Sequence, residues 1–136
     1  MKVLVVDDAA FMRMTIKNII EKSGHEVVGE ADNGRKAAEL CRSLTAEGKK
    51  PDLVTMDITM PEVDGIEGLT YIKEFDKSIN VVMVTAMGQT AMVQEAIVKG
   101  ALDFIVKPFK EDRIRDALAQ IQLMLEKRSC NIPACS

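Results

Sequence analysis

Acidic, hydroxyl and ammonium side chains stand directly after four short apolar runs of this sequence of 136 residues. They are Asp7, Asp8, Asp57, Thr85 and Lys107. If the runs are strands of one sheet, three carboxylates would meet, repel one another and cost free energy on burial. One lysine offsets one charge, so the set suits a small divalent cation, Mg2+ or Mn2+, held by carboxylate, carbonyl and water oxygens.

The same groups are suited to phosphoryl transfer. A metal and an ammonium group would neutralise phosphoryl oxygens, a hydroxyl would donate a hydrogen bond, and a carboxylate would be the nucleophile. Asp57 stands alone after its apolar run and is the candidate nucleophile. Asp7 and Asp8 form an adjacent pair that suits metal binding.

Strands and helices must alternate to position these residues. Apolar runs predict strands at Val3–Val6, Glu26–Glu30, Asp52–Met56, Val81–Thr85 and Asp103–Val106. Periodic patterns predict helices over about Phe11–Lys22, 32–47, from a capping box at Asp64 and Glu67, over about Gly88–Lys99, and from Pro108 to about Leu125. The alternation predicts an α/β fold, a doubly wound (βα)5 unit with a five-stranded parallel sheet, whose ligand site lies beyond the carboxyl ends of the strands.

Several polar residues have ordinary structural explanations. Asp8 taken alone could be a helix N-cap. Asp52, Asp103 and His25 would lie at the opposite edge of the sheet, and we expect loop or capping roles for them. In the fourth helix we expect Val93, Ala96 and Ile97 to face inward. Cys41, Cys130 and Cys135 lack the spacing of a metal or redox motif and are expected to be free thiols.

Composition limits the broad class. The net charge is −3, there is no basic stripe, and no apolar run approaches the ~18 residues of a membrane span, so we expect neither nucleic acid nor a membrane as partner. The N-terminus does not resemble a signal peptide, which favours the cytoplasm. We expect one domain over residues 1–127, a short flexible tail over 128–136, and a monomer.

Four ordered motifs resemble the receiver domain of two-component response regulators: "VDDAAFMR", "PDLVTMDITMPEVDGIEGL", "VVMVTAMG" and "GALDFIVKPF". The resemblance covers residues 1 to about 125 and looks most like the single-domain chemotaxis type, CheY-like regulators. It implies a flavodoxin-like sheet of strand order 2-1-3-4-5, an order known for CheY-type folds rather than worked out from this sequence.

The resemblance also implies roles for individual residues. Asp57 would accept the phosphoryl group from a sensor histidine kinase, with Mg2+ held by Asp7, Asp8, Asp57 and the backbone carbonyl of Thr59. Asp8 would be a direct ligand and Asp7 would act through water. Thr85 and Lys107 would contact the phosphoryl group, and the Lys107–Pro108 peptide would be cis. Phe104 would be an aromatic switch, and Ala86 and Met87 would border the site.

Such a protein is a switch that catalyses only its own phosphorylation and dephosphorylation. The signal would leave through Gln89–Lys99, Phe104 and the outer face of Arg113–Gln122, toward the flagellar motor switch protein. Neither Thr59 nor Met87 can act as an acid near the phosphoryl group, so we expect slow self-dephosphorylation and a partner phosphatase.

Three alternatives compete with this hypothesis. A phosphorelay intermediate would share every site residue. A metal-dependent phosphatase with an aspartyl intermediate would place its nucleophile in a D-x-D motif after the first strand, where this chain has adjacent aspartates. An FMN binder of the same fold would need a phosphate loop there, which "DDAAF" would repel without a metal.

Overall fold

The structure of the protein is a computed structural model that describes residues 1–58, 65–86 and 90–130, without the side chains of residues 90 and 128–130. The predicted Asp64 end of the third helix lies outside this part of the chain, as do Thr59, Met87 and Cys135.

Strands and helices alternate along the described chain. The strands are β1 (Lys2–Val6), β2 (Glu26–Ala31), β3 (Leu53–Asp57), β4 (Asn80–Ala86) and β5 (Asp103–Lys107). The helices are α1 (Ala10–Lys22), α2 (Gly34–Ala46), α3 (Gly65–Phe75), α4 (Thr90–Val98) and α5 (Glu111–Cys130). All strand pairs are parallel and the order is β2-β1-β3-β4-β5, which confirms the expected fold class and strand order.

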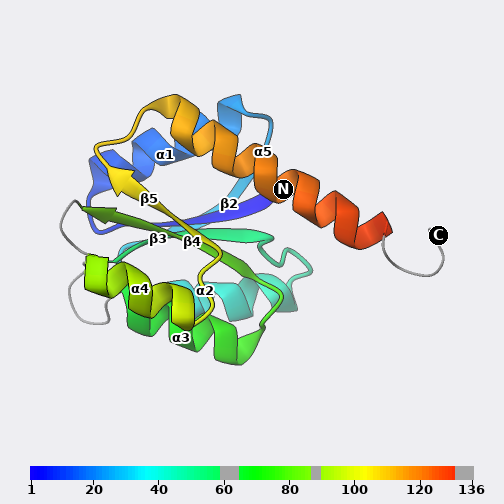
Figure 1. Ribbon diagram of the computed structural model, residues 1–136. Coiled ribbons are helices and arrows are strands. Elements are labelled where there is room, and N and C mark those ends of the chain that lie inside the picture. Colours follow the sequence, from blue (N-terminus) through cyan, green and yellow to red (C-terminus); the bar gives the residue numbers. More distant parts are fainter. Residues whose placement is uncertain (59–64, 87–89, 131–136) are drawn as a thin grey trace.

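The helices cover both faces of the sheet, α1 and α5 on one and α2, α3 and α4 on the other (Figure 1). Each face has its own buried core. On the α1 and α5 side, Val5, Ile16 and Leu118 are among the buried residues. On the other side, Met56, Leu69 and Met83 are among them. β1 and β3 are therefore apolar on both faces, as their sequences indicate.

Helix α5 is longer than the sequence suggests. It continues to Cys130, so the first residues assigned to the tail, 128–130, are helical. The apolar stripe of Ile114, Leu118 and Ile121 is buried as expected, and Figure 1 shows that the end of the helix extends past the sheet. The sequence does not show this extension because the apolar stripe ends at Leu125, and the next two residues, Glu126 and Lys127, are exposed.

The expectation that Ile97 faces inward is wrong. Ala96 is buried and Val93 packs against the core, but Ile97 is exposed. Helix α4 is apolar on more than one side, since Met92 packs against the core like Val93, whereas Ile97 and Val98 are exposed. When a helix lacks a single apolar stripe, its buried side cannot be predicted from the sequence.

An ion pair holds the connection between α2 and β3. Lys50 Nζ lies 2.7 Å from Asp76 Oδ2, in the connection between α3 and β4. Hydrogen bonds from Lys50 and Ser78 lower the pKa of Asp76 to about 2. The carboxylate thus remains charged at neutral pH, and the two connections are held together at the amino ends of the strands.

Helices α2 and α3 approach each other through glycines. A Cβ atom on Gly68 would lie 2.8 Å from Gly34 Cα and 3.1 Å from Met56 Cε. Backbone cannot move aside as easily as the end of a side chain, so this position requires glycine. The contact holds α3 against the sheet close to Asp57.

Gly68→Ala should lower the free energy of unfolding by about 1–3 kcal/mol through overpacking, although alanine favours helix by ~1 kcal/mol. Urea unfolding of both proteins measures the difference. The matched control is Glu74→Ala in the same helix, an exposed position where the change should stay within about 0.5 kcal/mol. A Gly68→Ala protein as stable as wild type would contradict this account of the packing.

Candidate functional site

The three aspartates meet at the carboxyl ends of neighbouring strands. Asp7 follows β1 directly and Asp57 is the last residue of β3. Because Val6 pairs with Met56, the chain brings both acids to the same level of the sheet. One carboxylate oxygen from each of Asp7, Asp8 and Asp57 lies within 4.8 Å of the others. The structure therefore places these residues together, as their positions in the sequence suggest.

Two of these carboxylates are buried. Asp7 has 0% and Asp57 6% of its surface exposed, whereas Asp8 is exposed. Burial of a charged carboxylate costs several kcal/mol unless it is paired, and a second carboxylate nearby adds repulsion. The site needs positive charge to hold this arrangement.

Lys107, the last residue of β5, supplies part of that charge. Its Nζ atom lies 3.0 Å from Asp7 Oδ2 and 3.7 Å from Asp57 Oδ2. In the sheet order β4 lies between β5 and β3, so the lysine side chain reaches across the end of β4 to the acids. One ammonium group offsets one of the three negative charges, and a divalent cation would offset the other two.

The oxygens of Asp7 and Asp8 differ in what they contact. Asp7 Oδ1 accepts a hydrogen bond of 2.9 Å from the amide of Ala9, and Oδ2 faces Lys107. Both oxygens of Asp7 are thus engaged by the protein, while the exposed carboxylate of Asp8 stands at the rim. This arrangement suits Asp8 as a direct metal ligand and Asp7 as a residue that acts through water.

The donor set fits Mg2+ or Mn2+. Carboxylate oxygens in an acidic cluster, with room for water on the exposed side of Asp8, are the ligands that these hard cations prefer. The remaining ligand expected from the sequence, the carbonyl of Thr59, lies outside the described residues.

The other predicted site residues lie on β4 and β5. Thr85 is buried, and its hydroxyl lies 3.2 Å from the carbonyl oxygen of Ala86, to which it can donate. Ala86 is exposed and pairs with Lys107 across the sheet. Phe104 is partly exposed on β5. The Lys107–Pro108 peptide is cis, as expected. Met87 is outside the part of the chain that the structure describes.

The residues expected to have structural roles lie away from the acidic cluster. Asp52 accepts a hydrogen bond from the amide of Lys2 at 2.8 Å, and Asp103 accepts one from the amide of Phe104. His25 lies 3.0 Å from the N-terminal amine, and its pKa is lowered by burial and by that charge. Burial also raises the pKa of Cys41 to about 12, which keeps this thiol protonated and unreactive at neutral pH.

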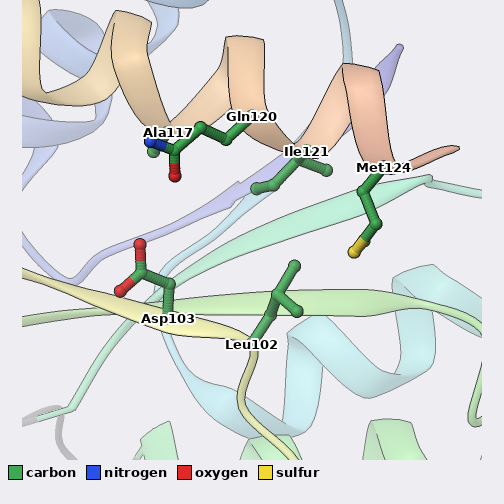
Figure 2. A pocket seen from close by; sticks show the side chains of 6 residues that line it. All are labelled: Leu102, Asp103, Ala117, Gln120, Ile121 and Met124. Carbon is green, nitrogen blue, oxygen red and sulfur yellow. The ribbon is translucent and has the colours of Figure 1, made fainter. Parts of the chain in front are cut away.

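A separate pocket of about 370 Å3 lies between β5 and α5. Figure 2 shows its lining: Leu102, Asp103, Ala117, Gln120, Ile121 and Met124. The pocket contains none of the predicted site residues and is distinct from the acidic cluster.

In the described residues, no helix is both long and apolar enough to cross a membrane.

Two residues beside the site belong to motifs quoted above, but no role could be predicted for them from the sequence. Arg13 of α1 donates a hydrogen bond of 2.8 Å to the carbonyl oxygen of Asp7. A Cβ atom on Gly65 would lie 2.0 Å from the carbonyl oxygen of Asp57, so α3 begins in direct contact with the end of β3. Both contacts join residues through the backbone, which leaves no mark of charge pairing or periodicity in a sequence.

Comparison with known proteins identifies similar chains along almost the whole length. The family model described as "Response regulator receiver domain" matches residues 3–119. The chain is 54% identical over 120 residues to the chemotaxis protein CheY of Thermotoga maritima, covering 88% of this chain and 96% of that protein. It is 55% identical over 117 residues to the chemotaxis protein CheY of Bacillus subtilis, covering 86% and 93%.

Solved structures agree with these matches. The response regulator domain of Thermotoga maritima CheB has a TM-score of 0.77 at 38% identity, covering 90% of this chain and 94% of that one. The Borrelia burgdorferi complex of CheX, CheY, BeF3 and Mg2+ contains a chain with a TM-score of 0.77 at 35% identity, covering 91% and 87%.

Mg2+ should stabilise the wild-type chain against heat through the acidic cluster. A ligand at 100 times its dissociation constant contributes about 2.7 kcal/mol, and Asp8→Asn should remove most of the gain in midpoint temperature. The same variant should be at least as stable as wild type in EDTA, because one repulsive charge is gone. Asp116→Asn, an exposed aspartate of α5, controls for net charge and should respond to Mg2+ like wild type. An equal Mg2+ response in Asp8→Asn would exclude this site.

Proposed function

The chain belongs to the response regulator receiver domain family, and from this membership and the acidic site we propose how it works as a switch. It is a phosphorylation-activated chemotaxis response regulator, a signalling protein and not an enzyme with a separate substrate. One observation supports the proposed mechanism most directly: Asp7, Asp8 and Asp57 form one cluster, and the ammonium group of Lys107 lies beside Asp7 and Asp57.

In the proposed reaction, Asp57 is the nucleophile. A carboxylate oxygen of Asp57 attacks the phosphorus of a phosphohistidine on a sensor histidine kinase. The new bond is an acyl phosphate O–P bond, the P–N bond breaks, and the released imidazole takes up a proton. Mg2+ held by Asp8 and Asp57, with Asp7 acting through water and Thr59 through its carbonyl, would supply positive charge to the phosphoryl oxygens.

Two further residues act on the phosphoryl group in this proposal. Lys107 already lies 3.7 Å from Asp57 and would shift its contact toward the new phosphoryl oxygens. Thr85, whose hydroxyl is near the carbonyl of Ala86, would turn to donate a hydrogen bond to the same group. Ala86 is small enough to leave room beside them, and Met87 would border the site.

The output surface in this proposal combines α4, β5 and α5. It is defined here by Ile97, Val98, Leu102, Phe104 and Val106, all exposed apolar residues. Val98 is 87% exposed. A groove of about 470 Å3 continues the surface onto α5, lined by Phe104, Val106, Pro108, Phe109, Lys110, Asp112, Arg113 and Asp116. Apolar residues gathered on a surface mark protein-binding sites.

The partners proposed are a chemotaxis sensor kinase, the flagellar motor switch protein and a phosphatase. The identity to CheY proteins favours the motor over the phosphorelay alternative. The complex of a related CheY with CheX makes a CheX-like protein a further candidate partner. The family match leaves the aspartyl phosphatase and FMN-binding alternatives without support.

Incubation of the chain with acetyl phosphate and Mg2+ should add one phosphate group to the wild type and none to Asp57→Asn. Intact mass spectrometry measures the adduct. The control Asp52→Asn changes a strand-associated aspartate at the opposite edge of the sheet and should be labelled like wild type. An adduct of equal yield on Asp57→Asn would refute the assignment of the phosphoacceptor.

Val98→Asp should weaken binding of the phosphorylated chain to the motor switch protein by roughly 10-fold or more, since a charge replaces an apolar contact. Labelling with acetyl phosphate should be unchanged. Met14→Asp, an exposed apolar residue of α1, is the matched control. Capture by a histidine phosphotransferase, with no binding to the motor protein, would favour the phosphorelay alternative instead.

A further inference from the structure

Arg13 connects helix α1 to the backbone of the acidic cluster. Its Nη1 atom donates a hydrogen bond of 2.8 Å to the carbonyl oxygen of Asp7. That carbonyl belongs to the peptide unit that joins Asp7 to Asp8. The guanidinium group therefore holds the peptide from which the Asp8 side chain departs.

Glu30 fixes the guanidinium group in turn. Arg13 Nε lies 3.0 Å from Glu30 Oε1, and the arginine side chain is only 18% exposed. Lys17 Nζ lies 2.5 Å from the other oxygen, Oε2. Hydrogen bonds from Lys17 and then Arg13 lower the pKa of Glu30, so the carboxylate is charged well below neutral pH. We call Arg13, Lys17 and Glu30 the α1–β2 clamp.

The turn after β1 is held at other points, but not at Asp8. The amide of Asp7 donates to the carbonyl oxygen of Ala31 at 3.1 Å, and the amide of Ala9 donates to Asp7 Oδ1 at 2.9 Å. Among the described residues, none donates a hydrogen bond to the exposed Asp8 carboxylate. Its direction is set by the backbone, and Arg13 holds the peptide next to it.

We propose that Arg13 is a positioning residue of the metal site, which orients the Asp7–Asp8 peptide and thereby the Asp8 carboxylate for Mg2+. This inference rests on the proposed function, because it concerns the same Mg2+ site. The role depends on the planar fork of arginine, which donates to a carbonyl from Nη1 and to a carboxylate from Nε at once. A lysine keeps the charge but has a single donor nitrogen.

Calorimetric titration of the full chain with Mg2+ tests the proposal. Loss of a partner that orients a metal ligand costs 10–100-fold in affinity, so Arg13→Lys and Arg13→Met should raise the Mg2+ dissociation constant by about 10-fold or more. Glu30→Ala should raise it less, because the Nη1 bond to Asp7 remains available. Lys17→Met removes the other cation that pairs with Glu30 and leaves the bond from Arg13 to Asp7 in place. Its Mg2+ dissociation constant should stay within about twofold of wild type.

A second measurement separates positioning from simple loss of stability. In acetyl phosphate labelling, Arg13→Lys should need about 10-fold more Mg2+ for half-maximal labelling, yet reach the wild-type yield at saturating Mg2+. Unfolding midpoints in EDTA for Arg13→Lys and Lys17→Met should be similar.

The outcomes distinguish this inference from the proposed function. If the wild-type chain binds Mg2+ and Arg13→Lys binds it with the same affinity, the positioning role of Arg13 is overturned and the metal site is not. Equal weakening in Lys17→Met and Arg13→Lys would also overturn it, because damage to the clamp as a whole, and not loss of the Nη1 bond to Asp7, would then account for the effect. A wild-type chain that takes up no Mg2+ would overturn the metal site and the positioning role together.

Discussion

The burial of two aspartates at the ends of adjacent strands is the constraint on which the rest of the site depends. Asp7 and Asp57 are held together because β1 and β3 pair in register at the centre of the sheet. Their mutual repulsion would favour separation of the strand ends if positive charge were absent. Lys107 offsets part of this charge, and a divalent cation at the acidic cluster would offset the rest. The stability of the fold and the chemistry of the site would then be coupled at one place.

The surroundings of the acids divide the structural task among several elements. β5 supplies the ammonium group, the turn after β1 supplies an amide to Asp7, and α1 supplies a guanidinium group to the backbone. Glycine at position 65 lets α3 touch the end of β3. None of these contacts needs to contribute a large free energy, because together they limit where each carboxylate can lie. A preorganised set of oxygens loses less entropy when a cation binds.

Sequence reasoning found the strands, their carboxyl ends and the acids because apolar runs on a parallel sheet are continuous and end at one edge. It did not find Arg13, since a bond from a side chain to a backbone carbonyl has no partner residue that can be read from the sequence. It misplaced Ile97 and ended α5 before Cys130, because α4 has no single apolar side and the end of α5 has no core to cover. The meeting of the acids and the lysine at the strand ends was predictable, whereas the ion pairs between α1 and β2, the backbone contacts and the end of α5 were not.

Strand β5 explains how a change at Asp57 could reach the output surface. Successive side chains of a strand point to opposite faces, so Ile105 packs in the core beside α5 while Phe104 and Val106 face outward. The same strand ends in Lys107, whose ammonium group is shared between Asp7 and Asp57. A phosphoryl group on Asp57 would draw Lys107 toward new oxygens and change the charge that holds the end of β5. Because β4 and β5 pair through Thr85 and Val106, a movement of the buried threonine would act on the same strand. Two inputs to one short strand can shift a two-state equilibrium of its exposed side chains without any large rearrangement of the sheet.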